Sequence, residues 1–466
     1  MERERKGMTR SSRHMDMLHG PLSGKIITFA LPLIASGVLQ QSFNAVDVAF
    51  VGRYCSSTAI AAVGSNGPVI SILVNLFLGV AVGANVVIAM YIGRADGEGV
   101  KRSVSTVMSV TLLSGVLLLL LGLTLARPIL EAMGAPAEVL ELATRYLRIY
   151  FCGMPFIMIY NFGSAIMRSV GDTSRPFYAL LVATLCNMLL NWLFTGIWGM
   201  GVEGVAWATV ASNAINAGIM ILFLVNEPEP YTLVLSRWKL SGKDFKEMLR
   251  IGIPAGLQGM VFSISNIFIQ ASVNKFGADA IAGSAMAVTY EAYCYYIISA
   301  FAQSAIAFTG QNYGAGQARR CRRVMALCML YSSLLCGVAN GVIVLNPGEF
   351  LGIFTKDEEV IRYAVVRFHT VLVFQWLASS YEISGSYMRG LGYSMTPMLL
   401  TVLGTCVLRL GWVAVFPKID YSFTTLLDIY PISWIATGVA VVTAALTVQR
   451  RAFLKLVRAK ENHYKR

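Results

Sequence analysis

Residues 31–53 read LPLIASGVLQQSFNAVDVAFVGR, and residues 253–275 read IPAGLQGMVFSISNIFIQASVNK. The second stretch lies 222 positions after the first, and each is a mainly apolar run with a proline near its start. In this register, identical residues occur at Pro32/Pro254, Gly37/Gly259, Asn44/Asn266, Val51/Val273 and, further on, Tyr91/Tyr313. The chain therefore contains an internal duplication that includes these two stretches.

A second block of the duplication follows with one residue of slippage. At a spacing of 221, Met167 recurs as Met388 and Pro176 recurs as Pro397. We therefore expect each half of the chain to form one folding unit. In membrane proteins, internal repeats of this size are typical of secondary transporters, whose substrate site lies between the repeats.

The composition is that of a membrane protein. Of the 466 residues, 56% are hydrophobic and only 14% are charged, with a mean hydropathy of +0.62, whereas a soluble domain carries about a quarter charged residues. A helix needs about 20 apolar residues to cross a ~30 Å hydrocarbon core. Twelve spans of this kind are predicted, at 25–52, 59–92, 104–126, 142–167, 177–198, 204–225, 247–274, 280–310, 324–345, 360–388, 396–416 and 425–449.

The predicted fold class is an all-α polytopic membrane protein of twelve transmembrane helices in two six-helix repeats. Six spans per half is an even number, so both halves enter the membrane from the same side and the repeats are parallel. The expected segments are a cytoplasmic tail 1–21, an N-terminal lobe 22–226, a cytoplasmic linker 227–246, a C-terminal lobe 247–449 and a basic cytoplasmic tail 450–466.

The net charge of +13 is distributed unevenly between the predicted loops. With the N-terminus inside, the inner segments collect 28 Lys and Arg residues and the outer loops 5. Cytoplasmic loops of membrane proteins carry such a positive excess, so both termini should be cytoplasmic, in the cell inner (plasma) membrane. Each basic cluster lies next to an apolar span, so topology explains the charge and no nucleic-acid partner is expected.

Motifs for catalysis and for nucleotide hydrolysis are missing from the sequence. It has no His-Glu-x-x-His, no Gly-x-Ser-x-Gly and no Gly-x-x-x-x-Gly-Lys-Ser/Thr, which argues against an enzyme and against an ATP-driven pump. We therefore expect energy to come from an ion gradient and no cofactor to be needed. A membrane enzyme and a passive channel are the competing classes, and duplicated repeats favour alternating access over both.

Asp47 lies within the first predicted span, where an ionisable group costs about 2.5–3.5 kcal/mol. Asn187 and Asn191 are four residues apart in the fifth span, and Thr209 lies in the sixth. At 1.5 Å per residue, Asp47, Asn191 and Thr209 fall at similar depths. One carboxylate with amide and hydroxyl oxygens suits Na⁺, a hard cation, and a lone Asp can equally carry a proton. Alternatively, the Asn and Thr side chains only join helices by hydrogen bonds.

The duplication assigns this polar set to one half. Asp47 corresponds to Ile269, and Asn191 corresponds to Trp412. A purely structural role would more naturally appear in both halves, so a cation site would belong to the N-terminal half.

Glu291 and Glu382 are the acidic residues predicted within spans 8 and 10. Glu382 precedes Arg389 by seven residues, about 10 Å along a helix, which is too far for a simple ion pair. Glu291 lies one turn from Tyr295, and an acid beside aromatic rings suits an organic cation, with cation–π contacts of about 0.5–2 kcal/mol. The alternative is a structural Glu bonded to a neighbouring helix. We expect Glu291, Glu382 and Tyr295 to contact the substrate.

Several stretches resemble the MATE (multidrug and toxic compound extrusion) family, and together they extend the similarity over roughly residues 22–450. The stretches are Leu31-Pro32 with Asn44-Ala45-Val46-Asp47 and Val51-Gly52-Arg53, Ile166 to Pro176, Cys186 to Trp192, Gly204 to Thr209, and Gly310 to Gly316.

The resemblance implies two six-helix lobes around a central cleft and an antiporter that exports cationic, often aromatic, drugs in exchange for Na⁺ or H⁺ by alternating access. By position, the residues that match the family's cation site are Asp47, Asn187, Asn191 and Thr209, with Asn161 as a further polar member. Some members carry an acid in the seventh span, where this chain has Phe262, Ser263 and Ser265. A second cation site in the C-terminal lobe is therefore left open.

A flippase for lipid-linked substrates is the nearest alternative function. Its cleft should carry several Arg or Lys residues for phosphate, whereas the clearest mid-span base here is Arg409. The intramembrane acids favour small organic cations as substrates. Besides these and the lipid bilayer no partner is expected, and we expect a monomer.

Overall fold

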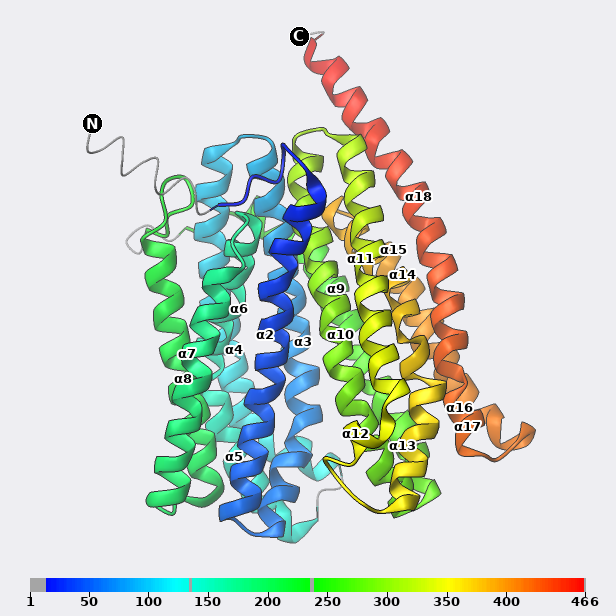
Figure 1. The fold of residues 1–466 in the computed structure, drawn as a ribbon. Coiled ribbons are helices and arrows are strands. Elements are labelled where there is room, and N and C mark those ends of the chain that lie inside the picture. Colours follow the sequence, from blue (N-terminus) through cyan, green and yellow to red (C-terminus); the bar gives the residue numbers. More distant parts are fainter. Residues whose placement is uncertain (1–13, 134–135, 235–238, 465–466) are drawn as a thin grey trace. The chain divides into compact units, whose positions relative to one another are not determined.

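The computed structural model describes residues 14–133, 136–234 and 239–464, and within these ranges the chain is helical without any strand (Figure 1). The predicted all-α polytopic fold is thereby confirmed. Parts of the expected cytoplasmic segments, namely 1–13, 235–238 and 465–466, lie outside the described residues.

The described residues of the first half of the chain form seven α-helices and one π-helix. In chain order these are α2 Leu22–Tyr54, α3 Ser57–Gly93, α4 Gly97–Ala132, α5 Ala137–Cys152, α6 Met154–Ser169, α7 Ser174–Asn191, the π-helix η1 Trp192–Ile197 and α8 Gly201–Val225. The start of α4 has a side-chain cap, because Asp96 Oδ1 accepts a hydrogen bond of 2.8 Å from the backbone N–H of Gly99.

The second half repeats this order with more interruptions. Its elements are α9 Gly242–Val273, η2 Asn274–Phe276, α10 Ala278–Gly314, α11 Ala318–Leu345, α12 Pro347–Leu351, α13 Glu358–Thr370, η3 Leu372–Ala378, α14 Ser379–Gly390, α15 Met395–Thr401, η4 Val402–Val407, α16 Leu408–Ile419, α17 Phe423–Leu427 and α18 Ile429–Tyr464.

The number of helices that can span a membrane agrees with the prediction of twelve. Among the described residues, ten helices are long and apolar enough to cross a membrane. In this count, helical segments that follow each other without a break, such as α7 and η1, are taken as one helix. The pair α5 and α6, bent by 47°, makes an eleventh. The bend lies at Gly153, and Pro155 follows in the first turn of α6, where its missing N–H costs no helix hydrogen bond. With 37 residues, α10 is long enough to be the twelfth.

Contacts within the chain divide it into two units. Unit 1 comprises Met1–Asp16 and Ala35–Gly256, and unit 2 comprises Met17–Ile34 and Leu257–Arg466. The first part of α2 thus belongs to unit 2, and the first half of α9 belongs to unit 1. Both divisions fall two residues after a duplicated proline, Pro32 or Pro254. The two units thus exchange short helix segments at the starts of α2 and α9.

Glycines explain why the first half of α9 packs in unit 1. Gly79 and Gly83 on α3 are four residues apart, as are Gly252 and Gly256 on α9. A Cβ atom added to Gly79 would clash with the backbone of Gly256, and one added to Gly252 would lie 2.5 Å from the Cα of Val80. Small residues at this spacing let two membrane helices approach until their backbones touch.

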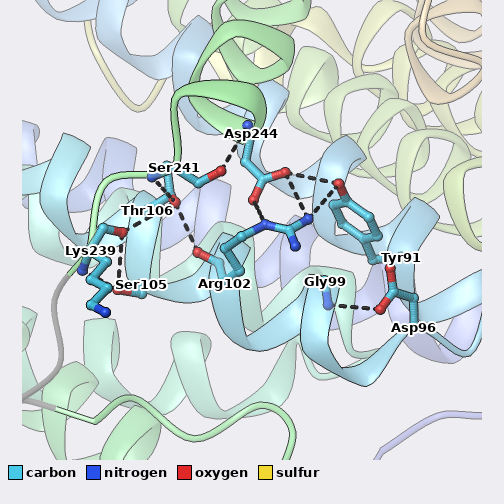
Figure 2. A network of polar contacts seen from close by, with 9 residues as sticks. All are labelled: Tyr91, Asp96, Gly99, Arg102, Ser105, Thr106, Lys239, Ser241 and Asp244. Carbon is cyan, nitrogen blue, oxygen red and sulfur yellow. Dashed lines mark hydrogen bonds and ion pairs between the residues drawn. The ribbon is translucent and has the colours of Figure 1, made fainter.

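A polar network fixes the start of α9 to the same unit (Figure 2). The carboxylate of Asp244 accepts hydrogen bonds from Arg102 Nε at 2.7 Å and from the Tyr91 hydroxyl at 2.8 Å. The Asp244 side chain is 1% exposed, so its charge needs these donors. Ser241 N–H donates to Thr106 Oγ1 at 3.1 Å and extends the contact to the segment before α9.

The matching segment before α2 is held in unit 2. Arg320 on α11 donates hydrogen bonds to the backbone carbonyls of Met17, His19 and Gly20. Within the same unit, the rings of Phe29 and Phe308 pack edge to face with their centroids 5.5 Å apart. The two exchanged segments are therefore held by different kinds of contact. Close glycine packing and the Asp244 network hold the start of α9, whereas Arg320 and the Phe29–Phe308 ring contact hold the start of α2.

Candidate functional site

Three helices of unit 1 bring the predicted cation-site residues together. Asp47 lies on α2, Asn187 and Asn191 on α7, and Thr209 on α8. Asn191 Nδ2 donates to Asp47 Oδ1 at 2.7 Å and to Asn187 Oδ1 at 3.1 Å. Thr209 Oγ1 donates to Asp47 Oδ2 at 2.8 Å. Asp47, Asn191 and Thr209, which were predicted at similar depth, thus form one hydrogen-bonded cluster together with Asn187.

The cluster is buried and carries one uncompensated charge. Asp47 is 5% exposed, and Asn187 and Asn191 are fully buried. None of the ion pairs formed by the described residues includes Asp47. Within the same residues, Asn191 Oδ1 and Asn187 Nδ2 have no hydrogen-bond partner. A buried carboxylate beside an unused amide oxygen is an arrangement that a small cation completes.

Local structure supports this geometry at the end of α7. The π-helix η1 begins at Trp192, directly after Asn191. Short π-helical segments often occur at functional sites because the extra residue per turn redirects side chains.

A cavity of about 350 Å³ in unit 1 opens onto Asp47 and Thr209. Its other polar lining residues are Gln40, Asn44, Ser71, Tyr146, Tyr150, Tyr160, Asn161, Asn213 and Asn216. The volume lies within the range of sites for drug-sized molecules, about 300–1,000 Å³. Asp47 is the single acidic residue of this lining, and the lining contains no basic residue.

The predicted member Asn161 lines this cavity from α6. Its Nδ2 donates a hydrogen bond of 2.8 Å to the carbonyl of Ile157, one turn earlier in the same helix, so its amide oxygen is left for other partners. Asn161 and Asp47 therefore line the same cavity.

Sequence reasoning missed other residues of the cavity. Asn213 and Asn216 follow Thr209 by four and seven residues and therefore share its helix face. Asn216 is 1% exposed, and neither polar atom of its side chain has a partner among the described residues. This spacing was a signal that could have found both. Tyr146 and Tyr150 on α5 carried no such signal, because tyrosines in spans are common packing residues.

In unit 2, Glu291 on α10 is joined to a cation of the protein itself. Arg367 on α13 donates from Nε to Glu291 Oε1 at 2.6 Å and from Nη2 to Oε2 at 3.0 Å. The contact of Glu291 with substrate stays a prediction, and an organic cation would have to compete with this guanidinium.

Glu382 on α14 has a different surrounding. Its Oε1 accepts a hydrogen bond of 3.1 Å from the hydroxyl of Tyr295 on α10. No ion pair of the described residues includes Glu382. The structure thus brings together two of the three predicted substrate residues and assigns Tyr295 to Glu382 rather than to Glu291.

Comparison with known proteins gives the family. The sequence model of the family described as MatE matches residues 32–193 and 254–413, one match in each half of the chain. The chain belongs to the MatE family. Members of this family are membrane transporters, so the expectation that the protein is not an enzyme is confirmed.

Curated relatives cover most of the chain. It is 28% identical over 382 residues to the probable multidrug resistance protein YoeA of Bacillus subtilis, covering 80% of this chain and 82% of the relative. It is 26% identical over 398 residues to the probable multidrug resistance protein NorM of Thermotoga maritima, covering 83% and 84%.

Solved structures share the fold. A crystal structure of MATE in the straight conformation superposes with a TM-score of 0.84 at 24% identity, covering 94% of this chain and 97% of that one. A MOP superfamily transporter from Pyrococcus furiosus, described as having a binding pocket of reverse polarity, gives a TM-score of 0.82 at 24% identity, covering 95% and 98%.

Proposed function

We propose that the protein is a secondary antiporter that exports cationic, often aromatic, compounds in exchange for Na⁺ or H⁺, with Asp47 as the coupling residue. The observation that carries the proposal is the buried carboxylate of Asp47, which has neutral hydrogen-bond donors and no paired basic side chain. A buried charge of this kind needs a neutralising cation. Because the described part of the protein supplies none, the cation comes from solution.

The oxygen atoms around Asp47 can bind either coupling ion. The Asp47 carboxylate, the unpaired Asn191 Oδ1 and the Thr209 hydroxyl are oxygen ligands, which Na⁺ prefers. A proton would instead neutralise Asp47 directly. Groups of three or more His, Cys, Asp or Glu that could hold a transition metal do not occur among the described residues. The chemistry of the cluster therefore fits an exchangeable monovalent ion.

The substrate class rests on two observations. The curated relatives are named as multidrug resistance or multidrug export proteins. In unit 2, the Glu382 carboxylate beside the Tyr295 ring, whose side chain is 38% exposed, offers a negative charge next to an aromatic face. This combination attracts organic cations by charge and by cation–π contact.

We infer from the positive excess of the inner loops that both termini are cytoplasmic. We further propose that the protein acts as a monomer in the plasma membrane, so that export runs outward from the cytoplasm.

Efflux measurements with separately imposed gradients test the proposal. Ethidium, a fluorescent aromatic cation, is added to the medium outside inside-out vesicles that contain the protein. A Na⁺ gradient or a pH gradient is then imposed across the vesicle membrane. We expect uphill ethidium uptake under one of these gradients and none without a gradient. Uptake that depends on neither gradient would refute antiport.

A further inference from the structure

Among the described residues of unit 2, Glu291 and Arg367 form the most buried ion pair. The Arg367 side chain is 4% exposed and the Glu291 side chain 12%. Besides the two bonds to Glu291, Arg367 Nη1 donates to Ser284 Oγ at 2.8 Å. Gln375 Nε2 donates to the backbone carbonyl of Glu291 at 2.8 Å and joins a further element to the pair. The guanidinium is thus held in one position by three acceptor atoms.

The duplication relates this pair to the cation site of unit 1. At a spacing of 221, Arg367 on α13 corresponds to Tyr146 on α5, which lines the cavity of Asp47. In the same register, Tyr430 on α18 corresponds to Thr209, a hydrogen-bond donor to Asp47. The guanidinium of Arg367 lies 5.4 Å from the Tyr430 ring. A position that lines the Asp47 cavity in unit 1 thus carries the arginine of the ion pair in unit 2, and the position of Thr209 carries an aromatic ring beside that arginine.

A second guanidinium makes this region of unit 2 positive. Arg409 on α16 lies 4.4 Å from the Tyr430 ring, and its Nε donates to Ser433 Oγ at 3.0 Å. Arg409 is 3% exposed, and no ion pair of the described residues includes it. Two buried guanidinium groups thus lie beside the Tyr430 ring, and Glu291 pairs with one of them, Arg367. The surplus positive charge opposes the entry of a further cation.

We propose that Arg367 is a permanently bound cation for Glu291, so that Glu291 exchanges no coupling ion and the counterpart of the Asp47 site in unit 2 is closed. The inference rests on the proposed function, because it concerns which residues count in cation exchange. A guanidinium does not lose its proton in proteins, and its planar fork matches a carboxylate. An incoming Na⁺ would have to displace it and leave the buried guanidinium without its carboxylate, which is strongly unfavourable.

The coupling number of a charge-neutral double variant tests the inference. Wild-type protein and Glu291→Gln/Arg367→Gln are reconstituted in liposomes with the membrane potential held at zero. For each imposed cation gradient, we measure the ethidium gradient at which net ethidium flux is zero. The logarithm of the ethidium ratio is plotted against the logarithm of the cation ratio, and the slope gives the number of cations exchanged per ethidium. We expect the same slope for both proteins. A slope lower by about one in the double variant would overturn the inference, since one carboxylate binds one monovalent ion.

The single variant Arg367→Gln supplies an independent readout. It leaves the Glu291 carboxylate without its internal cation, so thermal unfolding in detergent should depend more steeply on Na⁺ or on pH than in the double variant. Identical Na⁺ and pH dependence of the two variants would contradict the inference. Glu359→Gln/Arg362→Gln is the matched control, because this pair lies on the same helix and both side chains are about 60% exposed.

The outcomes separate this inference from the proposed function. If the protein is not a cation-coupled antiporter, the wild-type slope is zero and both proposals fail together. If the wild type shows coupling and only the double variant loses a cation, antiport stands and the role of Arg367 as a tethered cation fails.

Discussion

Thr209 Oγ1 and Asp47 Oδ2 lie 2.8 Å apart in a buried hydrogen bond between helices whose contact residues are 162 positions apart in the chain. The bond joins α2 to α8. Asn213 and Asn216 lie on the same face of α8 as Thr209 and line the cavity. It makes the carboxylate of Asp47 sensitive to the position of α8. We propose that movement of α8 and occupancy by a cation are coupled through this pair of atoms.

Replacing Thr209 by Val should weaken the coupling site. The substitution keeps the shape and removes the hydroxyl, and a hydrogen bond to a charged group contributes about 1.5–3 kcal/mol. Because Na⁺ would lose an oxygen ligand, we therefore expect the Na⁺ concentration for half-maximal efflux to rise by about 10- to 100-fold. Thr209→Ser retains the hydroxyl and should stay close to wild type. Equal behaviour of the Val and Ser variants would show that the bond plays no part in cation binding.

Glu382→Gln should reduce the affinity for cationic substrates. The change removes the negative charge while keeping the size and the acceptor for the Tyr295 hydroxyl. A cation beside an aromatic ring and an acid gains about 0.5–2 kcal/mol from the ring alone, so Tyr295→Leu should also weaken binding. The measurement is the KM for ethidium efflux in vesicles with matched expression. Asp279→Asn, at an exposed position at the start of α10, is the control. An unchanged KM in Glu382→Gln would remove this residue from the substrate site.

Asp244→Asn should destabilise unit 1. The variant replaces a buried carboxylate that accepts from Arg102 and Tyr91 and leaves those donors with a neutral partner (Figure 2). Because the Arg102 side chain is 41% exposed, water compensates part of the loss, and we expect about 1–3 kcal/mol. A lower melting temperature in detergent measures the effect. Glu247→Gln removes an exposed partner of Arg250 on the same helix and should change little. Equal melting of the two variants would argue against the network as an anchor of α9.

Gly252→Ala should disturb the contact between α3 and α9. The added Cβ would lie 2.5 Å from the Cα of Val80, which is backbone and has no free direction to move. Forced overpacking costs about 1–3 kcal/mol. Gly218→Ala on α8 is the matched control, since a Cβ there meets nothing within 4 Å, and it should be neutral or slightly stabilising. Thermal unfolding of both variants, side by side, measures the difference.

Glu227, in the segment after α8, should make the stability of the folded protein depend on pH. Burial acts to raise the pKa of Glu227, but hydrogen bonds from His14 and Arg175 outweigh it and hold the pKa below its usual value. A depressed pKa contributes stability above the pKa of the unfolded state, about 4.3, which is lost as pH falls through the folded pKa. The melting difference between wild type and Glu227→Gln should therefore be largest near neutral pH and shrink below about pH 4. A difference that grows on acidification would contradict this assignment.

The sequence alone predicted the cluster around Asp47 because helix geometry carries the necessary information. Asn187 and Asn191 are four residues apart and share a face, and a fixed rise per residue places Thr209 at the depth of Asp47. The duplication then limited the cluster to one half. Sequence periodicity could not give the partner of Glu291, because Arg367 lies 76 residues away and the pairing depends on how α10 and α13 pack.

The exchange of helix segments between the units was also beyond the sequence prediction. The hydropathy of α9 is continuous across Pro254, so nothing in the apolar pattern separates its two halves. The Gly79/Gly83 and Gly252/Gly256 spacings were visible, but the small-residue pattern gives no information on which helices meet. Asp244 was predicted to be part of a linker, and its role as a buried acceptor depends on Tyr91 and Arg102 from two other helices.

Uphill transport by Asp47→Asn is the measurement that tests the central claim most directly. The variant keeps the size of the side chain and an amide that can hydrogen-bond with Thr209, and it removes the negative charge. In liposomes with an imposed Na⁺ or H⁺ gradient, ethidium accumulation against its own gradient is compared with downhill ethidium exchange in the same preparation. The account predicts that Asp47→Asn retains downhill exchange and loses gradient-driven accumulation. Accumulation at the wild-type rate in Asp47→Asn would show that the coupling site lies elsewhere.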